Sequence, residues 1–473
     1  GQGDSRRVRL VQWKKEFLMA LPTTSRVRAP LPILFFAAVL ALAGCATSAP
    51  GPVGPISTGN PRVDPVTGEP TGDLGTDTVG EEGMGDLAEE DIPTGPYTPP
   101  HMEGREIIRA GVLLPFTHPN ERVRQQAEGM LAGIELALFD FGNENVVLLP
   151  KDTGGSVSQA TIAAEDLRNQ GADVVLGPLF GANVQTVREA LTPPQETDFF
   201  GFVTEPAEEP NPVIAFSNDR SVASYGAWLA SIAPEEEVSA IVEYAALRGY
   251  DQFAFFGPQS GLGTRVEAAM QQAVLENGGF MLTSGFYPAS STNPNTEAEY
   301  FAQTIANAVE AGGRIAVLVP ERGNRLRRIA PLLAYYGVDT RQVKMLGTGA
   351  WNDANIWREP SLRGAWFPTA PSVDVADFEQ RFARMYGAAP SSLAAVAYDA
   401  AALVIALSED GELTPGELIN RDGFMGINGL FRFRDDGTAE RSLAIMEIDP
   451  TAEDGTGVKE ILPVSPSFDE TIG

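Results

Sequence analysis

The segment IIRAGVLLPFTHPNERVRQQAEGMLAGIELAL, residues 107–138, joins a short apolar run to a long amphipathic one. Residues 107–114 have the length of a strand, and Pro115 ends the run. Apolar residues then recur at intervals of three and four, which places them on one face of a helix: Val123, Ala127, Met130, Leu131, Ile134, Ala137, Leu138 and Phe141. An apolar strand followed by a one-sided helix predicts a parallel sheet covered by helices on both faces.

The same alternation continues to residue 448. It predicts strands at 146–149, 173–176, 199–203, 213–216, 253–256, 280–286, 315–319, 343–346 and 365–367. It predicts helices that end near 170 and 191, and further helices over 222–232, 235–247, 265–275, 297–309, 324–336, 373–386 and 392–407. Residues 429–434 and 442–448, around a turn at 435–437, read as a closing hairpin. The fold class is therefore α/β, with two doubly wound parallel-sheet lobes around a central cleft.

Composition limits the classes of function. A chain of 473 residues, of which 43% are hydrophobic, is long enough for two domains. Its formal net charge of -29 argues against nucleic acid as a partner, because phosphates are neutralised by a basic face. The single cysteine, Cys45, excludes a disulfide framework.

The neighbours of Cys45 suggest its role. Arg26 and Arg28 precede the apolar run 31–42, and the run ends Leu-Ala-Gly-Cys, as an export signal does. These four closing residues resemble the bacterial lipobox, in which the cysteine is acylated and becomes the new N-terminus. A buried structural cysteine is the alternative, but it explains neither the flanks nor the Gly-Cys ending. Residues 1–18 precede a plausible start at Met19.

Residues 46–104 differ in composition from the rest of the chain. They hold ten prolines, eleven acidic residues and one basic residue, Arg62, without apolar periodicity. Such a segment buries too little surface to order itself, so it reads as a disordered, extended tether. At ~5–6 Å × √n, its 59 residues span on the order of 40 Å if fully flexible.

The body offers few groups for catalysis. His118 is the one histidine of residues 105–473. It lies beside Pro119, and the sequence has no Gly-x-Ser-x-Gly motif whose serine it could activate, so an ordinary turn residue is the simpler interpretation. The glycine-rich turn 257–263 lacks the Lys-Ser/Thr ending of a phosphate-binding loop. The sequence therefore predicts no enzyme, no cofactor and no metal site. Carboxylate-only catalysis of the glycosidase type stays formally open, since acidic residues are abundant.

The dense basic patch of the acidic body is a run of four arginines in the helix expected over 324–336 and just before it: Arg322, Arg325, Arg327 and Arg328. A solvated helix face is one interpretation. The other is a docking site for an anionic partner, with Arg322, Arg325 and Arg328 as contact candidates.

Several motifs together resemble a known family. They are GVLLPF at 111–116, DTGG at 152–155, VVLGPL at 174–179, and GLFRF at 429–433 followed by Gly437, Arg441 and Leu443. This pattern resembles the type I periplasmic binding proteins, which are leucine-binding-protein-like, and within them the lipoproteins called penicillin-binding protein activators. The resemblance implies two lobes joined by three crossings of the chain.

The implied division of the chain has seven segments. They are 1–45, leader and lipoprotein signal peptide; 46–104, tether; 105–220, lobe 1; 221–347, lobe 2; 348–420, return to lobe 1; 421–450, closing hairpin of lobe 2; and 451–473, tail.

A ligand in the cleft would touch loops at the carboxyl ends of strands. The candidate residues are Pro115, Phe116, Thr117, Thr153, Leu179, Phe180, Gly181, Thr204, Gln259 and Tyr287. By resemblance, solute-binding relatives hold an amino acid by its ammonium and carboxylate, with hydroxyls on the loops after the third and fourth strands. Here the third-strand loop offers Leu179 and Phe180 instead, which leaves Thr204 after the fourth.

Two functions follow from the resemblance. The first is a non-enzymatic lipoprotein that regulates a peptidoglycan synthase, a penicillin-binding protein, by protein contact. The alternative is a solute-binding lipoprotein that delivers amino acids or small peptides to the permease of an ABC transporter. Both imply the periplasm and a lipid anchor. The residue after the cysteine is Ala46 and not an aspartate, which points by resemblance to the outer membrane.

Overall fold

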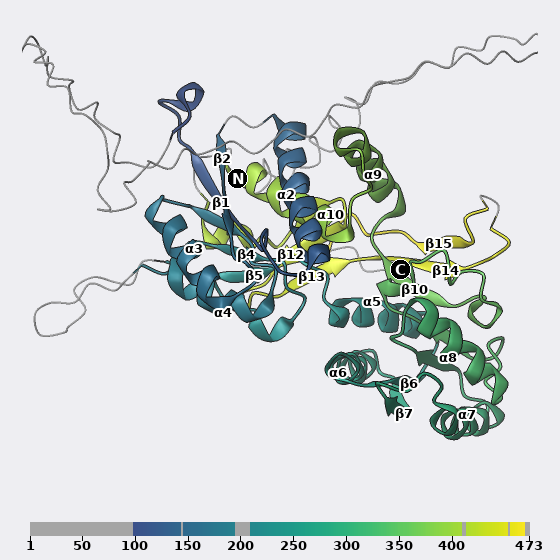
Figure 1. Ribbon diagram of the computed structural model, residues 1–473. Helices are drawn as coiled ribbons and strands as arrows, with labels where there is room; N and C mark the ends of the chain where they lie inside the picture. The colour runs from purple at the N-terminus through teal and green to yellow at the C-terminus, as the bar shows by residue number, and fades with distance from the viewer. Residues whose placement is uncertain (1–97, 143–144, 194–208, 409–412, 453–454, 469–473) are drawn as a thin grey trace, which may run out of the picture. The chain divides into compact units, whose positions relative to one another are not determined.

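The computed structural model describes residues 98–142, 145–193, 209–408, 413–452 and 455–468 (Figure 1). Within these ranges, no helix combines the length and the apolar character that crossing a membrane requires. Cys45, the tether up to residue 97, the strand expected at 199–203 and Thr204 lie outside the described residues. The α/β fold with two parallel-sheet lobes is confirmed.

The first sheet has five parallel strands in the order β2-β1-β3-β4-β5. The strands are β1 (Ile108–Leu114), β2 (Val146–Asp152), β3 (Val174–Leu176), β4 (Val213–Ala215) and β5 (Ala227–Leu229). The helices that cover them are α2 (Glu121–Phe141), α3 (Val157–Asn169), α4 (Gly181–Leu191), α9 (Ser372–Tyr386) and α10 (Ser392–Leu407). Figure 1 shows α3 and α4 on one face of this sheet and α2 and α10 on the other. We call this sheet with its helices lobe 1.

The central strand β1 is buried on both faces, as its apolar run predicts. Val112 and Leu114 belong to the core beneath α2 and α10, whereas Leu113 belongs to the core beneath α3 and α4. Gly111 has no room for a side chain, because a Cβ there would lie 2.5 Å from a methyl carbon of Leu167 in α3. The helix therefore packs directly on the strand.

Lobe 2 is built on a seven-stranded sheet in the order β15-β14-β10-β9-β8-β6-β7. Its strands are β6 (Gln252–Gln259), β7 (Phe280–Pro288), β8 (Ile315–Leu318), β9 (Lys344–Leu346), β10 (Trp366–Thr369), β14 (Ala444–Ile448) and β15 (Val458–Leu462). The last two pair antiparallel and the others parallel. Helices α5 (Pro234–Leu247) and α6 (Gly261–Glu276) cover one face, and α7 (Asn295–Glu310) and α8 (Gly323–Tyr335) cover the other.

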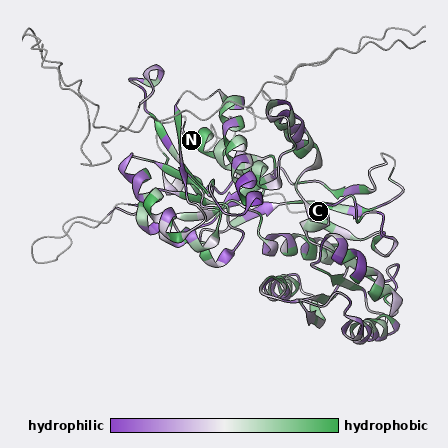
Figure 2. Cartoon of the chain, viewed as in Figure 1, coloured by the Kyte–Doolittle hydropathy of each residue, from purple (hydrophilic) through white to green (hydrophobic). Residues whose placement is uncertain are grey.

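A third, antiparallel sheet of three strands completes lobe 1. It contains β11 (Phe424–Gly426), β12 (Gly429–Phe433) and β13 (Ala439–Ser442), and the short helix α11 (Pro415–Leu418) precedes it. Its aromatic side chains pack into the same core as α2 and α10. Short 3-10 helices occur at η1 (Pro100–Met102), η2 (Arg220–Val222), η3 (Gly349–Trp351) and η4 (Pro360–Leu362). In Figure 2, the helices around the sheets carry hydrophilic residues together with hydrophobic ones, as one-sided burial requires.

Three expectations are corrected by these elements. The helix expected over 222–232 is wrong: Gly226 has a φ of +88°, which ends any helix there, and β5 follows. The hairpin of 429–434 with 442–448 is wrong, because β12 pairs with β13 across the tight turn at 434–438, while β14 joins the lobe 2 sheet. The closing hairpin thus packs in lobe 1. The chain also returns to lobe 1 after β10, not at residue 348, since β10 pairs with β9 and β14.

Candidate functional site

The carboxyl ends of β1, β2 and β3 bring three predicted loops together in lobe 1. The backbone N–H of Thr117 donates to Oδ1 of Asp152 at 3.2 Å, and its hydroxyl donates to Oδ2. The N–H of Gly154 donates to the same carboxylate at 2.9 Å. Burial opposes ionisation of Asp152, but these hydrogen bonds outweigh it and hold its pKa below the ordinary value. Asp152 therefore links the loops after β1 and β2, and both the N–H and the hydroxyl of Thr117 are hydrogen-bonded to it.

An aromatic pair stands beside these loops. The rings of His118 and Phe180 have centroids 5.6 Å apart. Gly155, with a φ of +82°, lies against both rings, and any side chain there would overlap them. Nδ1 of His118 accepts from the N–H of Asn120 at 3.1 Å. His118 therefore acts as part of an apolar wall, not as a base beside a nucleophile.

The first turn of α4 follows β3 and presents donors. Its N-cap residue, Phe180, provides no side-chain cap, and the N–H of Asn183 donates to the carbonyl of Phe180 at 3.0 Å, so among the described residues the N–H groups of Gly181 and Ala182 stay open. Ser217, which follows β4, places its hydroxyl 3.0 Å from where a Cβ on Gly181 would lie. Asn183, in the same turn, is 1% exposed, and its Nδ2 has no partner in the part of the chain that the structure describes. Such donors favour an anion.

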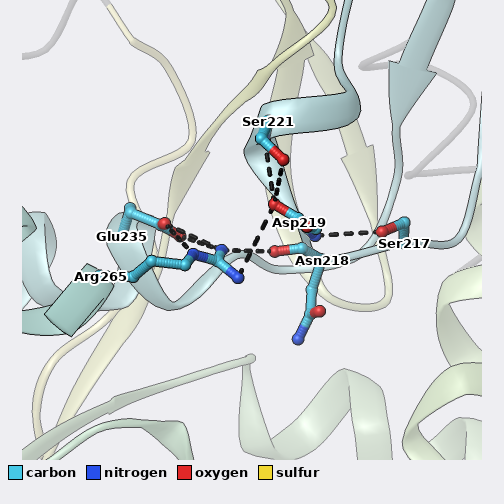
Figure 3. Close-up of polar contacts among 6 residues, drawn as sticks. All are labelled: Ser217, Asn218, Asp219, Ser221, Glu235 and Arg265. Atoms are coloured by element: carbon cyan, nitrogen blue, oxygen red, sulfur yellow. Dashed lines mark hydrogen bonds and ion pairs between the residues drawn. The ribbon is translucent and has the colours of Figure 1, made fainter. Parts of the chain in front are cut away.

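Arg265 connects the loop after β4 to lobe 2 (Figure 3). Its Nε and Nη2 donate to the two carboxylate oxygens of Glu235 at 2.9 and 3.0 Å, and Nη2 also donates to the carbonyl of Asn218 at 2.9 Å. Asp219 lies 3.9 Å from Nη1 and accepts from Ser221. Figure 3 shows the side chain of Asn218 pointing away from this cluster. Arg265 and Glu235 were not candidates from sequence.

The first turn of α5 carries three consecutive glutamates with three different environments. Glu235 pairs with Arg265, and Oε2 of Glu236 lies 3.4 Å from Nε of Arg441. Glu237 instead accepts from the backbone N–H of Gly349, and no lysine or arginine among the described residues pairs with it. Burial raises the pKa of Glu237 to about 7, against a small opposing effect of that hydrogen bond. Glu237 is therefore a largely buried carboxylate without a cation.

Glu237 lies where strands of lobe 2 end. Gly349 follows β9, and a Cβ on Gly349 would overlap Oε1 of Glu237 and lie 3.5 Å from the carbonyl of Pro368 in β10. The carboxyl ends of parallel strands are where ligands of α/β folds bind. The two lobes thus present an anion-seeking turn, α4, and a cation-seeking carboxylate, Glu237, each at a carboxyl edge.

The sequence matches the model of a periplasmic binding protein family over residues 107–456. The chain belongs to the periplasmic binding proteins. Curated proteins, in contrast, give no match.

Solved structures of binding proteins have the same fold. A putative branched-chain amino acid ABC transporter protein from Rhodospirillum rubrum is 17% identical, with a TM-score of 0.59 over 72% of this chain and 97% of that one. A branched-chain amino acid transporter protein from Rhodopseudomonas palustris is 14% identical, with a TM-score of 0.58 over 76% and 96%. A substrate-binding protein from Sphaerobacter thermophilus is 20% identical, with a TM-score of 0.55 over 76% and 98%. At these identities the likeness shows the fold alone.

In this binding protein, the candidates of lobe 1 gather at one edge. Pro115 and Thr153 are buried there, Phe116 and Leu179 are partly buried against the core, and Gly181 opens α4. In lobe 2, Gln259 is exposed at the end of β6.

Tyr287 has a different environment from the one expected of a ligand contact. It is fully buried, and its hydroxyl donates to Oε1 of Glu321 at 2.5 Å. Burial and this carboxylate both raise the pKa of Tyr287. Arg325 pairs with the same carboxylate at 2.9 Å and lies over the ring of Tyr287. Arg322, Arg327 and Arg328 are exposed.

The binding protein's described residues contain no group of three or more histidine, cysteine, aspartate or glutamate side chains arranged to hold a metal ion. Periplasmic binding proteins are generally non-enzymatic. The chemistry available at the two edges is recognition by charge and hydrogen bonding.

Proposed function

We propose that this protein is a solute-binding protein that holds an amino acid and delivers it to the permease of an ABC transporter. The observation that carries the proposal is the pair of complementary edges: open donors at α4 in lobe 1, and the unpaired carboxylate of Glu237 in lobe 2. An amino acid carries one group for each. The family and the fold agree with this assignment.

The carboxylate of the solute would bind at the first turn of α4. Backbone N–H groups and the helix dipole favour a negative group there, and no acidic side chain of α4 occupies its first turn. The buried Nδ2 of Asn183 and the hydroxyl of Ser217 add side-chain donors next to that turn. These donors stand in for the hydroxyls that the loop 179–182 lacks.

The ammonium of the solute would pair with Glu237. A buried carboxylate with a pKa of about 7 is partly protonated at neutral pH, because burial disfavours its charge. A bound ammonium removes that penalty and keeps Glu237 ionised. Solute binding at pH 7 should therefore release a fraction of a proton per molecule, about half.

Calorimetry tests the assignment. L-Leucine, L-valine and L-isoleucine are titrated first, together with 4-methylpentanoate, which keeps the leucine carboxylate and lacks the amine. Glu237→Gln should lose at least about tenfold in affinity for the amino acid, with little change for the des-amino analogue, as expected when a charge-assisted bond is lost. Glu243→Gln, on the same helix but exposed, is the matched control.

Two further readouts sharpen that test. The enthalpy of binding to the wild-type protein should depend on the ionisation enthalpy of the buffer, and this dependence should vanish in Glu237→Gln. Asn183→Ala should weaken both ligands equally, because both carry the carboxylate. If none of a full panel of the common amino acids binds the wild-type protein, the proposed function is wrong.

We also propose a lipid anchor at Cys45 and residence in the periplasm. The support is the Leu-Ala-Gly-Cys ending after an apolar run and the acidic, proline-rich segment 46–104 that follows it. A tether of that length lets the folded part act at a distance from the membrane that holds the anchor, and by resemblance Ala46 favours the outer membrane.

A second candidate function is regulation of a peptidoglycan synthase by protein contact. Helix α8 favours it, because Arg322, Arg327 and Arg328 are exposed next to or within a helix that contains no acidic residue. Arginine is enriched where proteins bind one another. Synthesis of glycan strands by a purified synthase should then accelerate when this protein is added. The double variant Arg322→Glu, Arg328→Glu should lose the effect, whereas Arg122→Glu, exposed in lobe 1, should keep it.

A further inference from the structure

The chain passes between the two lobes three times, at residues 230–233, 370–371 and 443. The second and third crossings lie side by side. Gly429, with a φ of +94°, separates them: a Cβ on it would lie 2.8 Å from the carbonyl of Ser442 and 3.5 Å from Cδ of Pro371. Any rotation of one lobe against the other bends these short segments, so they form the hinge.

Arg441 lies inside this hinge, directly before the third crossing. Its side chain is 2% exposed, and its Nη2 donates to the carbonyl of Ala230 in the first crossing. Its Nε lies 3.4 Å from Oε2 of Glu236, at the start of α5 in lobe 2. The guanidinium also lies over the ring of Phe431, 4.8 Å from its centroid. One side chain of lobe 1 therefore contacts the start of the first crossing, where Ala230 still packs in lobe 1, and a carboxylate of lobe 2.

A second carboxylate near Arg441 is already engaged. Asp399 of α10 accepts from the N–H of Ile427 at 2.7 Å and from the N–H and side-chain amide of Asn428 at 3.0 and 2.8 Å. Its charge acts on Arg441 from within lobe 1. Glu236 is the carboxylate left for Arg441 to hold across the hinge.

The hold on Glu236 is incomplete. Oε2 of Glu236 and the Nε and Nη1 atoms of Arg441 are buried and have no hydrogen-bond partner among the described residues. An ion pair without full hydrogen bonding is held by charge rather than by geometry. Such a contact can loosen and re-form when the hinge moves.

We propose that Arg441 is a hinge clamp, a positioning residue that ties the first crossing to the third and that loosens when Glu236 loses its charge. The clamp acts on the movement of the lobes and is independent of which solute binds. Deleting it should free the crossings while the sheets of both lobes keep their structure. This outcome separates a clamp from an ordinary buried ion pair, whose loss weakens the whole fold.

Hydrogen exchange of the backbone amides tests the clamp on the full chain without any ligand. In Arg441→Met, exchange over residues 229–237 and 442–445 should rise roughly tenfold or more, as expected for local opening, while β1 and β6 change less than about threefold. Arg441→Lys keeps the charge, and its exchange in the crossings should be faster than in the wild type and slower than in Arg441→Met. If Arg441→Met does not fold, Arg441→Lys still tests the clamp.

Arg432→Met is the matched control. Arg432 lies on the neighbouring strand β12, pairs with Glu440 at 2.8 Å and lies over the ring of Phe468, so it resembles Arg441 but touches no crossing. Its loss should leave exchange in the crossings unchanged. If Arg441→Met accelerates exchange uniformly in crossings and sheets, or leaves the crossings unchanged, the clamp is refuted.

Acidity supplies an independent arm of the test. The charged groups that face Glu236 are Arg441, Arg220 and Glu237, and Asp399 faces Arg441. Burial raises the pKa of Glu236 to about 7, so its charge is present above neutral pH and lost below it. After correction for intrinsic exchange rates, the crossings should open more at pH 6 than at pH 8 in the wild type. Glu236→Gln should open equally at both; a variant that keeps the wild-type difference would overturn the role of Glu236.

Discussion

Replacing Glu237 with glutamine should stabilise the protein without ligand at pH 8. Burial raises the pKa of this carboxyl from its ordinary 4.5 to about 7, so the folded protein binds the proton more tightly than the unfolded chain. The favourable contribution is complete below pH 4.5 and is lost as the pH rises to about 7. Above pH 7, folding therefore bears the full penalty of burying this charge.

The magnitude follows from the same shift. Each pKa unit corresponds to about 1.4 kcal/mol, so the ceiling for a change from 4.5 to about 7 is roughly 3 kcal/mol. Glutamine has nearly the same shape, and its carbonyl can still accept from the N–H of Gly349. We expect Glu237→Gln to raise the free energy of unfolding by about 1–3 kcal/mol at pH 8 and to change it little at pH 4.5.

Urea unfolding at pH 4.5, 6, 7 and 8 measures this difference. Glu235→Gln is the control, because it breaks a bidentate pair with Arg265 and should destabilise the protein, if it acts at all. The difference between Glu237→Gln and the wild type removes most of the titration of Glu236, because the charge of Glu237 raises the pKa of Glu236 less than burial does. A variant that is no more stable at pH 8 than at pH 4.5, relative to the wild type, would show that Glu237 is solvated or paired and would remove it from the proposed site.

Three other predictions concern packing, the buried tyrosine and the anchor. Gly133→Ala in α2 should destabilise the protein by about 1–3 kcal/mol, because its Cβ would overlap the carbonyl of Ala394 in α10. Gly129→Ala, whose Cβ would lie in open space, should stabilise the protein by up to about 1 kcal/mol. Equal effects of the two variants in thermal unfolding would contradict the close helix contact. Tyr287→Phe should cost about 1–3 kcal/mol of stability by removing one of the two partners of Glu321, and calorimetry should show unchanged solute affinity. Cys45→Ser should move the protein from the membrane to the soluble fraction, and mass spectrometry that finds no acyl group on the wild type would refute the anchor.

The order of elements could be predicted where the signal is local. The apolar run of β1 and the periodic stripe of α2 specify a buried strand and a one-sided helix by spacing alone, and both elements form as expected. The pattern failed near Gly226, where apolar residues at 227–230 match a helix as well as a strand. Burial on both faces of the first sheet decides between them, and burial is not visible in a window of sequence.

Long-range pairings could not be predicted at all. The sequence 442–448 reads as one strand, yet Ser442 pairs within lobe 1 and residues 444–448 belong to the sheet of lobe 2. The turn at 434–438 fixes how much of it can pair with β12, and the remainder is long enough for a strand elsewhere. Arg265 and Arg441 are separated from their glutamates by 30 and 205 positions of sequence, so no local motif pairs either arginine with its glutamate.

The three glutamates that open α5 show how long-range contacts give neighbouring residues different functions. By sequence they are one acidic turn that suits the helix dipole. In space, Glu235 meets the loop after β4 through Arg265, Glu236 meets the hinge through Arg441, and Glu237 meets the edge of lobe 2 at Gly349. The charge of Glu237 raises the pKa of Glu236, although less than burial does. A cation bound at Glu237 would offset that repulsion, lower the pKa of Glu236 and strengthen its pairing with Arg441, so the solute would tighten the hinge through two adjacent residues of one helical turn.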